Sequence, residues 1–327
     1  MIVPDPPGAL PFVPLREHLY SQDELTVRTP PASPGDDPAG DRPTVDEAIG
    51  AWFHGPGHGV DFAIARALHD ATIDSALVTH LAGRSVVGVM GGHADTRGSD
   101  RYVTGARLGR ALSRAGYHVA TGGGPGLMEA ANLGAWFAPA PDADLDTALE
   151  ILDAAPSYEA DPVAYTEVAC AVRDRWPNGG ESLGVPTWVY SQEPTSAFCT
   201  HIAKYFTNSI REDGLLALAR SGVVYAPGGA GTAQEIFTDA AQNTNTLYEV
   251  RSPMVFFGRV FHEQEEPELV AAVRRQATRF GWPELVTVVD DVDDAVAFVL
   301  AHDPDGASVA PDVATRRRRP ARGSDRR

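Results

Sequence analysis

A chain of 327 residues, 43% hydrophobic and 22% charged, has the composition of a globular protein with one large or two small domains. Its formal net charge of -17 argues against nucleic-acid binding, which needs clustered Lys and Arg to replace the counterions of the phosphate backbone. Cys170 and Cys199, the two cysteines, are too few for a disulfide framework or a structural zinc site. The first ten residues lack the pattern of a signal peptide, and no stretch of eighteen apolar residues follows. We therefore expect a cytoplasmic protein that does not cross a membrane.

The two ends of the chain differ in composition from its middle. Residues 1–45 are rich in Pro, Gly and Asp, which predicts a flexible arm, and residues 46–82 have apolar positions at helical spacing, which predicts a helical N-terminal extension. Residues 304–327 end in an Arg-rich stretch typical of a disordered tail.

Residues 83–303 alternate short apolar runs with helical patterns. We expect strands at 86–90, 117–120, 183–190, 222–226, 254–257 and 286–289. Helices are expected at 101–115, 127–135, 196–220, 232–242, 266–279 and 293–301, with an insertion at about 139–180. This order predicts an α/β fold: a doubly wound, Rossmann-like parallel sheet with helices on both faces. Ligands of such sheets bind beyond the carboxyl ends of the strands.

Two glycine clusters fall at those strand ends. The first contains Gly122, Gly123, Gly124 and Gly126, and it matches neither Gly-x-Gly-x-x-Gly nor a P-loop. The second contains Gly228, Gly229 and Gly231, followed by Thr232, and it leads into a helix that carries Glu235. Backbone amides at a helix start bind anions, so we expect both loops to contact a phosphate and Glu235 to face the same crevice. The alternatives are glycine turns that only allow close packing and a carboxylate that only stabilises its helix.

A polar stripe precedes the second cluster. His201, Lys204, Asn208 and Arg211 are spaced by three, four and three residues, which would place them on one face of a 196–220 helix. Lys204 and Arg211 could then pair with a phosphate, although a solvated helix face has the same pattern.

The segment from 227 to 235 resembles the signature Pro-Gly-Gly-x-Gly-Thr-x-x-Glu of the LONELY GUY (LOG) family, the cytokinin riboside 5'-monophosphate phosphoribohydrolases, often labelled lysine decarboxylases. The run from Gly122 through Glu129 to Asn132 is similar to the family's earlier loop. The resemblance implies a nucleoside 5'-monophosphate nucleosidase, which releases free base and ribose 5-phosphate without cofactor or metal. It implies catalytic roles for Glu235 and Arg211, a substrate contact for Glu129, and a homodimer or larger oligomer. The polar stripe adds Lys204 and Asn208 as expected substrate contacts. The family arginine precedes the signature proline by fifteen residues; that position is Glu212 here, and Arg211 is one residue earlier.

Two other functions remain open. A pyridoxal-phosphate decarboxylase would need a Schiff-base lysine, and Lys204 is the only lysine in the chain. A non-catalytic carrier of a nucleotide or of the molybdenum cofactor would need the same phosphate loops without turnover. For the enzyme, ordinary purine or pyrimidine monophosphates are the expected substrates.

Overall fold

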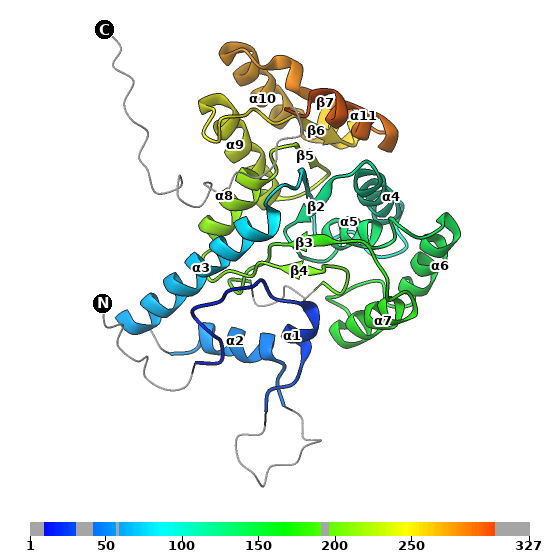
Figure 1. Ribbon diagram of the computed structural model, residues 1–327. Helices are drawn as coiled ribbons and strands as arrows, with labels where there is room; N and C mark the ends of the chain where they lie inside the picture. The colour runs from blue at the N-terminus through cyan, green and yellow to red at the C-terminus, as the bar shows by residue number, and fades with distance from the viewer. Residues whose placement is uncertain (1–9, 31–41, 57–58, 191–195, 305–327) are drawn as a thin grey trace.

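The computed structural model describes residues 10–30, 42–56, 59–190 and 196–304. Within these ranges a sheet of seven parallel strands has the order β4-β3-β2-β1-β5-β6-β7, with helices on both faces (Figure 1). The expected α/β fold is therefore confirmed. In chain order the strands are β1 (Val86–Met90), β2 (His118–Thr121), β3 (Ser182–Gly184), β4 (His201–Ile202), β5 (Gly222–Tyr225), β6 (Met254–Phe257) and β7 (Val286–Val289).

The central strands are apolar throughout because both of their faces are covered. Alternate side chains of β1 enter different cores: Val87 and Val89 pack on one side, and Val86 and Met90 on the other. The first face is covered by α4 (Asp100–Arg114), α5 (Leu127–Trp136) and α11 (Val292–His302). The second is covered by α3 (Val60–Leu81), α8 (Asn208–Leu218), α9 (Ala230–Asn245) and α10 (Pro267–Phe280), with the short turns η1 (Phe261–Glu265) and η2 (Pro283–Leu285) beside α10.

Residues 10–30 are part of the packed structure, which corrects the flexible arm that their composition predicted. The segment contains α1 (Gln22–Thr26), and Tyr20 forms an antiparallel bridge with Ile202 on the edge strand β4. Phe12, Tyr20 and Leu25 are buried there, and this apolar area offsets the cost of ordering the segment. The rest of the predicted arm, at 1–9 and 31–41, and the predicted tail at 305–327 lie outside the described residues.

The expected helical extension consists of α2 (Val45–His54) and α3. Thr44 caps α2 and forms a capping box with Glu47, a local signal that fixes the start of this helix. The 139–180 insertion contains α6 (Asp142–Leu152) and α7 (Pro162–Arg175), which pack against the outer side of α4 and α5 in a separate apolar cluster.

Two predicted elements differ from the structure. The strand expected at 183–190 ends at Gly184, soon before Pro186, which lacks the amide hydrogen that a continuing ladder needs. The helix expected at 196–220 begins only at Asn208, because the residues before it form β4 and a loop. Their apolar side chains are spaced as in a helix, but Ile202, Tyr205 and Phe206 are buried between the sheet edge and the N-terminal segment. Phe198 instead packs in the apolar cluster that contains α6 and α7.

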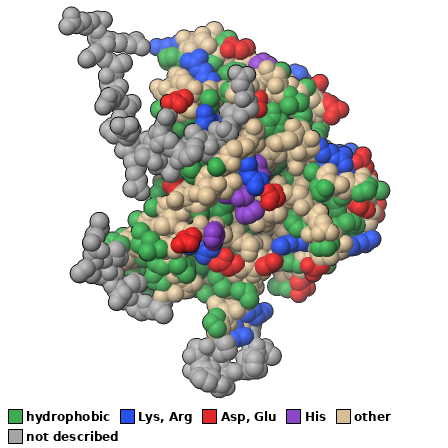
Figure 2. Space-filling model, in the orientation of Figure 1, with side chains coloured by type: hydrophobic (Ala, Val, Ile, Leu, Met, Phe, Trp, Pro, Cys, Tyr) green, Lys and Arg blue, Asp and Glu red, His purple; other side chains and the backbone are tan. Residues whose placement is uncertain are grey.

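Charged side chains are mixed on the surface. Figure 2 shows acidic and basic side chains interspersed on the visible face, without a continuous basic patch. Within the described part of the chain, every helix is too short or too polar to cross a lipid bilayer.

Candidate functional site

The candidate site lies where the strand order reverses. β1 pairs with β2 on one side and with β5 on the other, so the loops after β1 and β5 diverge at the carboxyl edge of the sheet. The amide of Gly92 donates to the carbonyl oxygen of Pro227 at 2.9 Å and joins the two loops. A cavity of about 550 Å³ opens beside them, large enough for a nucleotide.

Two helices begin at this cavity. Gly126 is the N-cap of α5 and Gly229 is the N-cap of α9, and neither of these two helix starts receives a hydrogen bond from a capping side chain within the described residues. Gly124, Gly126, Gly229, Gly231 and Thr232 line the cavity. The amides of a helix's first turn have no partner inside the helix, and the helix dipole adds positive potential. Both helix starts are therefore suited to an anion such as phosphate.

Close contacts with neighbouring atoms require glycine at several positions of these loops. Gly126 has φ +72°, and a Cβ at this position would lie 2.8 Å from the carbonyl oxygen of Gly92. A Cβ at Gly228 would collide with the side chain of Thr232. Gly123 has φ +75°, and a Cβ at this position would lie 2.9 Å from the ring of Pro186. Gly122 and Gly123 are buried and are not among the residues that line the cavity.

Arg211 and Glu235 meet inside the cavity. Arg211 lies on the first turn of α8, Glu235 lies in the second turn of α9, and Nη1 of the arginine donates to Oε1 of the glutamate at 3.3 Å. The two residues are only 7% and 8% exposed, and both line the cavity. The structure thus brings together the two residues to which the resemblance gave catalytic roles, although Arg211 is one residue away from the family position.

Glu212, which occupies that position, also lines the cavity. Its Oε1 accepts from Nδ2 of Asn208 at 2.9 Å, and its Oε2 accepts from the side-chain amide of Gln234. Asn208 therefore supports Glu212 and donates weakly to the hydroxyl of Tyr190 at 3.4 Å. Asn208 itself is not among the residues that line the cavity, and it reaches the cavity through these neighbours.

The cavity carries more negative than positive side chains. Asp95, Glu159, Glu212 and Glu235 line it, and Arg211 is the one Lys or Arg among its described lining residues. Burial raises the pKa of the Asp95 carboxyl, although the positive charge of Arg101 opposes the shift. A bound phosphate would therefore depend on the backbone amides of α5 and α9 together with Arg211.

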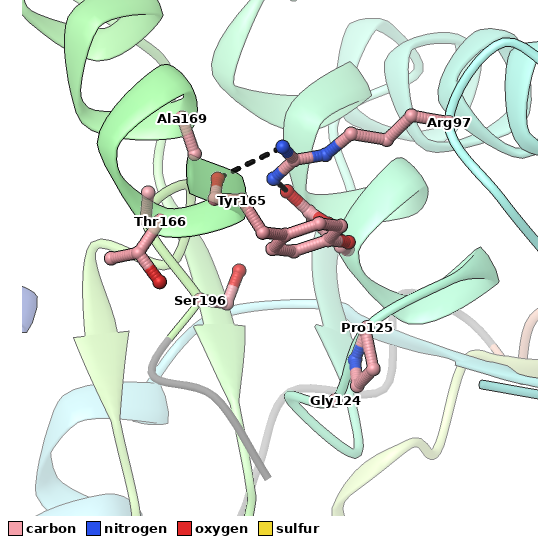
Figure 3. A pocket seen from close by; sticks show the side chains of 9 residues that line it. Arg97, Gly124, Pro125, Tyr165, Thr166, Ala169 and Ser196 are labelled. Atoms are coloured by element: carbon pink, nitrogen blue, oxygen red, sulfur yellow. Dashed lines mark hydrogen bonds and ion pairs between the residues drawn. The ribbon is translucent and has the colours of Figure 1, made fainter. Parts of the chain in front are cut away.

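Glu129 occupies a separate, buried cluster. Its carboxylate pairs with Nη2 of Arg97 at 2.5 Å and accepts from the hydroxyl of Tyr165, and burial raises its pKa while Arg97 opposes the shift. Arg97 stacks on the Tyr165 ring, with 3.3 Å from Cζ to the ring centroid, and donates to the Tyr165 carbonyl oxygen (Figure 3). The adjoining space of about 10 Å³ holds little more than one water molecule. Glu129 thus pairs with Arg97 and is not among the residues that line the large cavity.

Lys204 also lies away from the large cavity. It is 2% exposed, its Nζ pairs with Oδ2 of Asp46 at 2.9 Å, and it lies 5.4 Å from the ring centroid of Trp188. The predicted stripe of four polar residues is not formed, because Lys204 and His201 precede α8. The single lysine joins α2 to the loop after β4 and is not among the residues that line the large cavity.

Several cavity residues were not anticipated from the sequence. Residues 91–96, Tyr158 and Tyr190 line the cavity, but they come from irregular segments without a motif. The Gly91-Gly92 turn after the first strand was the available signal. Within the described residues, no group of three or more His, Cys, Asp or Glu side chains is arranged to hold a metal ion.

Comparison with known proteins gives a partial family match. Residues 84–139 match the model of the SLOG cluster4 family, LDcluster4. No curated protein matches the chain. Among solved structures, a molybdenum cofactor binding protein from the phototrophic bacterium Rippkaea orientalis is 14% identical with a TM-score of 0.42, over 67% of this chain and 96% of that one. A molybdenum cofactor carrier protein from Chlamydomonas reinhardtii is 21% identical with a TM-score of 0.40, over 67% and 98%. These two similarities are too low to carry a functional conclusion.

Proposed function

We propose that the protein hydrolyses the N-glycosidic bond of a nucleoside 5'-monophosphate, releasing the free base and ribose 5-phosphate. The observation that carries this proposal is the contact between Arg211 and Glu235 in a nucleotide-sized cavity, beside two helix starts without side-chain caps. The complete signature from Pro227 to Glu235, whose loop and helix start lie at this cavity, adds support.

The phosphate has a defined place in this proposal. The amides at the start of α9, the hydroxyl of Thr232 and the start of α5 supply neutral donors and dipole potential. Arg211 adds a full positive charge. With the phosphate held there, the ribose is directed toward Glu235, one helical turn further along α9.

The reaction needs a group that tolerates positive charge on the sugar. As the bond between C1' and the base nitrogen breaks, its electron pair leaves with the base and positive charge develops on the ribose. The carboxylate of Glu235 stabilises this charge and orients a water molecule, whose oxygen bonds to C1'. One proton of that water ends on the base nitrogen. Arg211 orients the glutamate, because it shares a hydrogen bond with it.

The test compares the wild-type protein with a Glu235→Gln variant. Both are incubated with AMP, GMP, CMP and UMP, and free base is quantified by chromatography. We expect base release by the wild type and a loss of at least about 100-fold in the variant, since the amide cannot balance the developing charge. Glu150→Gln, an exposed change on α6, should leave the rate unchanged.

A binding protein would behave differently in the same experiment. Nucleotide binding without release of base from any of the four monophosphates would contradict the hydrolase and indicate a carrier. Equal rates for the wild type and Glu235→Gln would contradict the role of Glu235 while leaving the activity itself in place.

A further inference from the structure

One wall of the large cavity comes from the 139–180 insertion. The linker between α6 and α7 contributes residues 156–159, and α7 contributes Tyr165. Tyr158 is half-buried, and its ring meets that of Tyr165 edge to face, with centroids 5.6 Å apart. Burial raises the pKa of the Tyr158 hydroxyl, so the side chain is a neutral aromatic group at physiological pH.

This wall is fixed to the phosphate-binding part of the site. The Arg97 backbone amide donates to the carbonyl oxygen of Pro156 at 3.0 Å, and its guanidinium donates to that of Ala155 at 3.3 Å. The same guanidinium pairs with Glu129, which lies in the first turn of α5. Arg97 thus connects the loop after β1, the start of α5 and the linker that carries Tyr158. The position of Tyr158 is therefore set relative to the helix start that would hold the phosphate.

The charge of the wall indicates which part of a nucleotide it contacts. Residues 156–159 include Glu159 and no basic side chain, and Asp95 lies on the same cavity. A phosphate beside these carboxylates would be repelled, whereas the helix starts attract it. An aromatic ring, in contrast, suits a nucleobase, because every base has a π face on which it can stack.

We propose that Tyr158 is the stacking platform for the nucleobase, so that the insertion forms the base subsite of the cavity and a purine, with its larger ring, binds more tightly than a pyrimidine. This assignment rests on the proposed function for its substrate class. It makes Tyr158 a specificity residue and Arg97 a positioning residue that holds the platform in place.

The test separates base contacts from phosphate contacts by ligand. Isothermal titration calorimetry measures the affinity of AMP, UMP and ribose 5-phosphate, which lacks a base, for full-length protein. Each is titrated into the wild type and into the Glu235→Gln background, which the proposed function expects to stop turnover. Tyr158→Ala should lower the affinity for AMP by about 10-fold, that for UMP by less, and that for ribose 5-phosphate by less than 2-fold. Tyr158→Phe should keep the AMP affinity, because stacking needs the ring and not the hydroxyl.

Three outcomes in the Glu235→Gln background overturn the proposal: AMP binds no tighter than ribose 5-phosphate, Tyr158→Ala leaves the AMP affinity unchanged, or Tyr158→Ala weakens the binding of both ligands equally. Val163→Ala, an exposed change on α7, controls for general effects on the insertion. The thermal unfolding midpoint of each variant shows that it is folded. Failure of the proposed function has a different signature, the absence of base release by the wild type, and leaves these affinities measurable.

Discussion

The carboxyl group of Asp239 is expected to make stability depend on pH near neutrality. Asp239 lies one turn beyond Glu235 on α9 and is 1% exposed. Burial raises its pKa from 3.8 to about 7, although the hydroxyls of Tyr225, at 2.8 Å, and Ser252, at 3.4 Å, donate to it and oppose the shift. Its carboxyl group is therefore protonated in the folded state at pH values where the unfolded chain ionises.

The sign and size of the effect follow from linkage. Because the folded pKa is the higher one, the stability from Asp239 is complete below pH 3.8 and is lost as the pH rises toward 7. Between pH 5 and pH 8 the free energy of unfolding should fall by about 2.5 kcal/mol from this group alone. Asp239→Asn keeps the shape of the side chain and cannot ionise, so it should lack this loss.

Urea denaturation at pH 5 and pH 8 measures the difference. The wild type should lose about 2.5 kcal/mol more than Asp239→Asn over this interval. Asp174→Asn, an exposed change on α7, should follow the wild type. Parallel pH dependence of the wild type and Asp239→Asn would refute the reasoning, because it would mean that burial does not hold the proton on this carboxyl.

Three further changes test other parts of the structure. Arg211→Ala should lower base release by about 100-fold in the chromatographic assay, because Glu235 loses its orienting partner; an unchanged rate would remove Arg211 from the mechanism. In urea denaturation, Gly126→Ala should lower the free energy of unfolding by at least about 1 kcal/mol more than Gly116→Ala. Both glycines have positive φ, but only at Gly126 would a Cβ meet backbone atoms, at 2.8 Å from the carbonyl oxygen of Gly92. Burial lowers the pKa of His118 to about 3, so from pH 7 to pH 5 the wild type should lose about 2 kcal/mol more stability than His118→Gln; equal losses would contradict this burial effect.

The parallel sheet was predictable because its signals are local. Short apolar runs such as 86–90 and 254–257, each followed by a turn and a helical pattern, correspond to β1 and β6 within the structure. The glycine loops were located for the same reason: a glycine cluster between a strand and a helix marks the carboxyl edge of the sheet.

The segment from 196 to 207 was not predictable in this way. Its apolar residues match a helix by spacing, but Ile202, Tyr205 and Phe206 are buried against the N-terminal segment around a two-residue edge strand. Lys204 was misplaced with that helix, because its partner Asp46 is 158 positions away in sequence. The cluster around Glu129 was not predictable for a similar reason, since Arg97 and Tyr165 reach this carboxylate from other elements. The cavity wall at 156–159 has no motif at all, and tertiary contacts alone bring it to the site.

The central claim is most directly tested by the product balance of a single reaction. The wild-type protein is incubated with AMP in water enriched in oxygen-18, and adenine and ribose 5-phosphate are quantified together by mass spectrometry. The proposed hydrolysis predicts equal amounts of both products, with one labelled oxygen on the C1 carbon of the sugar when the exchange of its aldehyde is corrected for. AMP, GMP, CMP and UMP that all remain intact under conditions where they bind the protein would contradict the proposal.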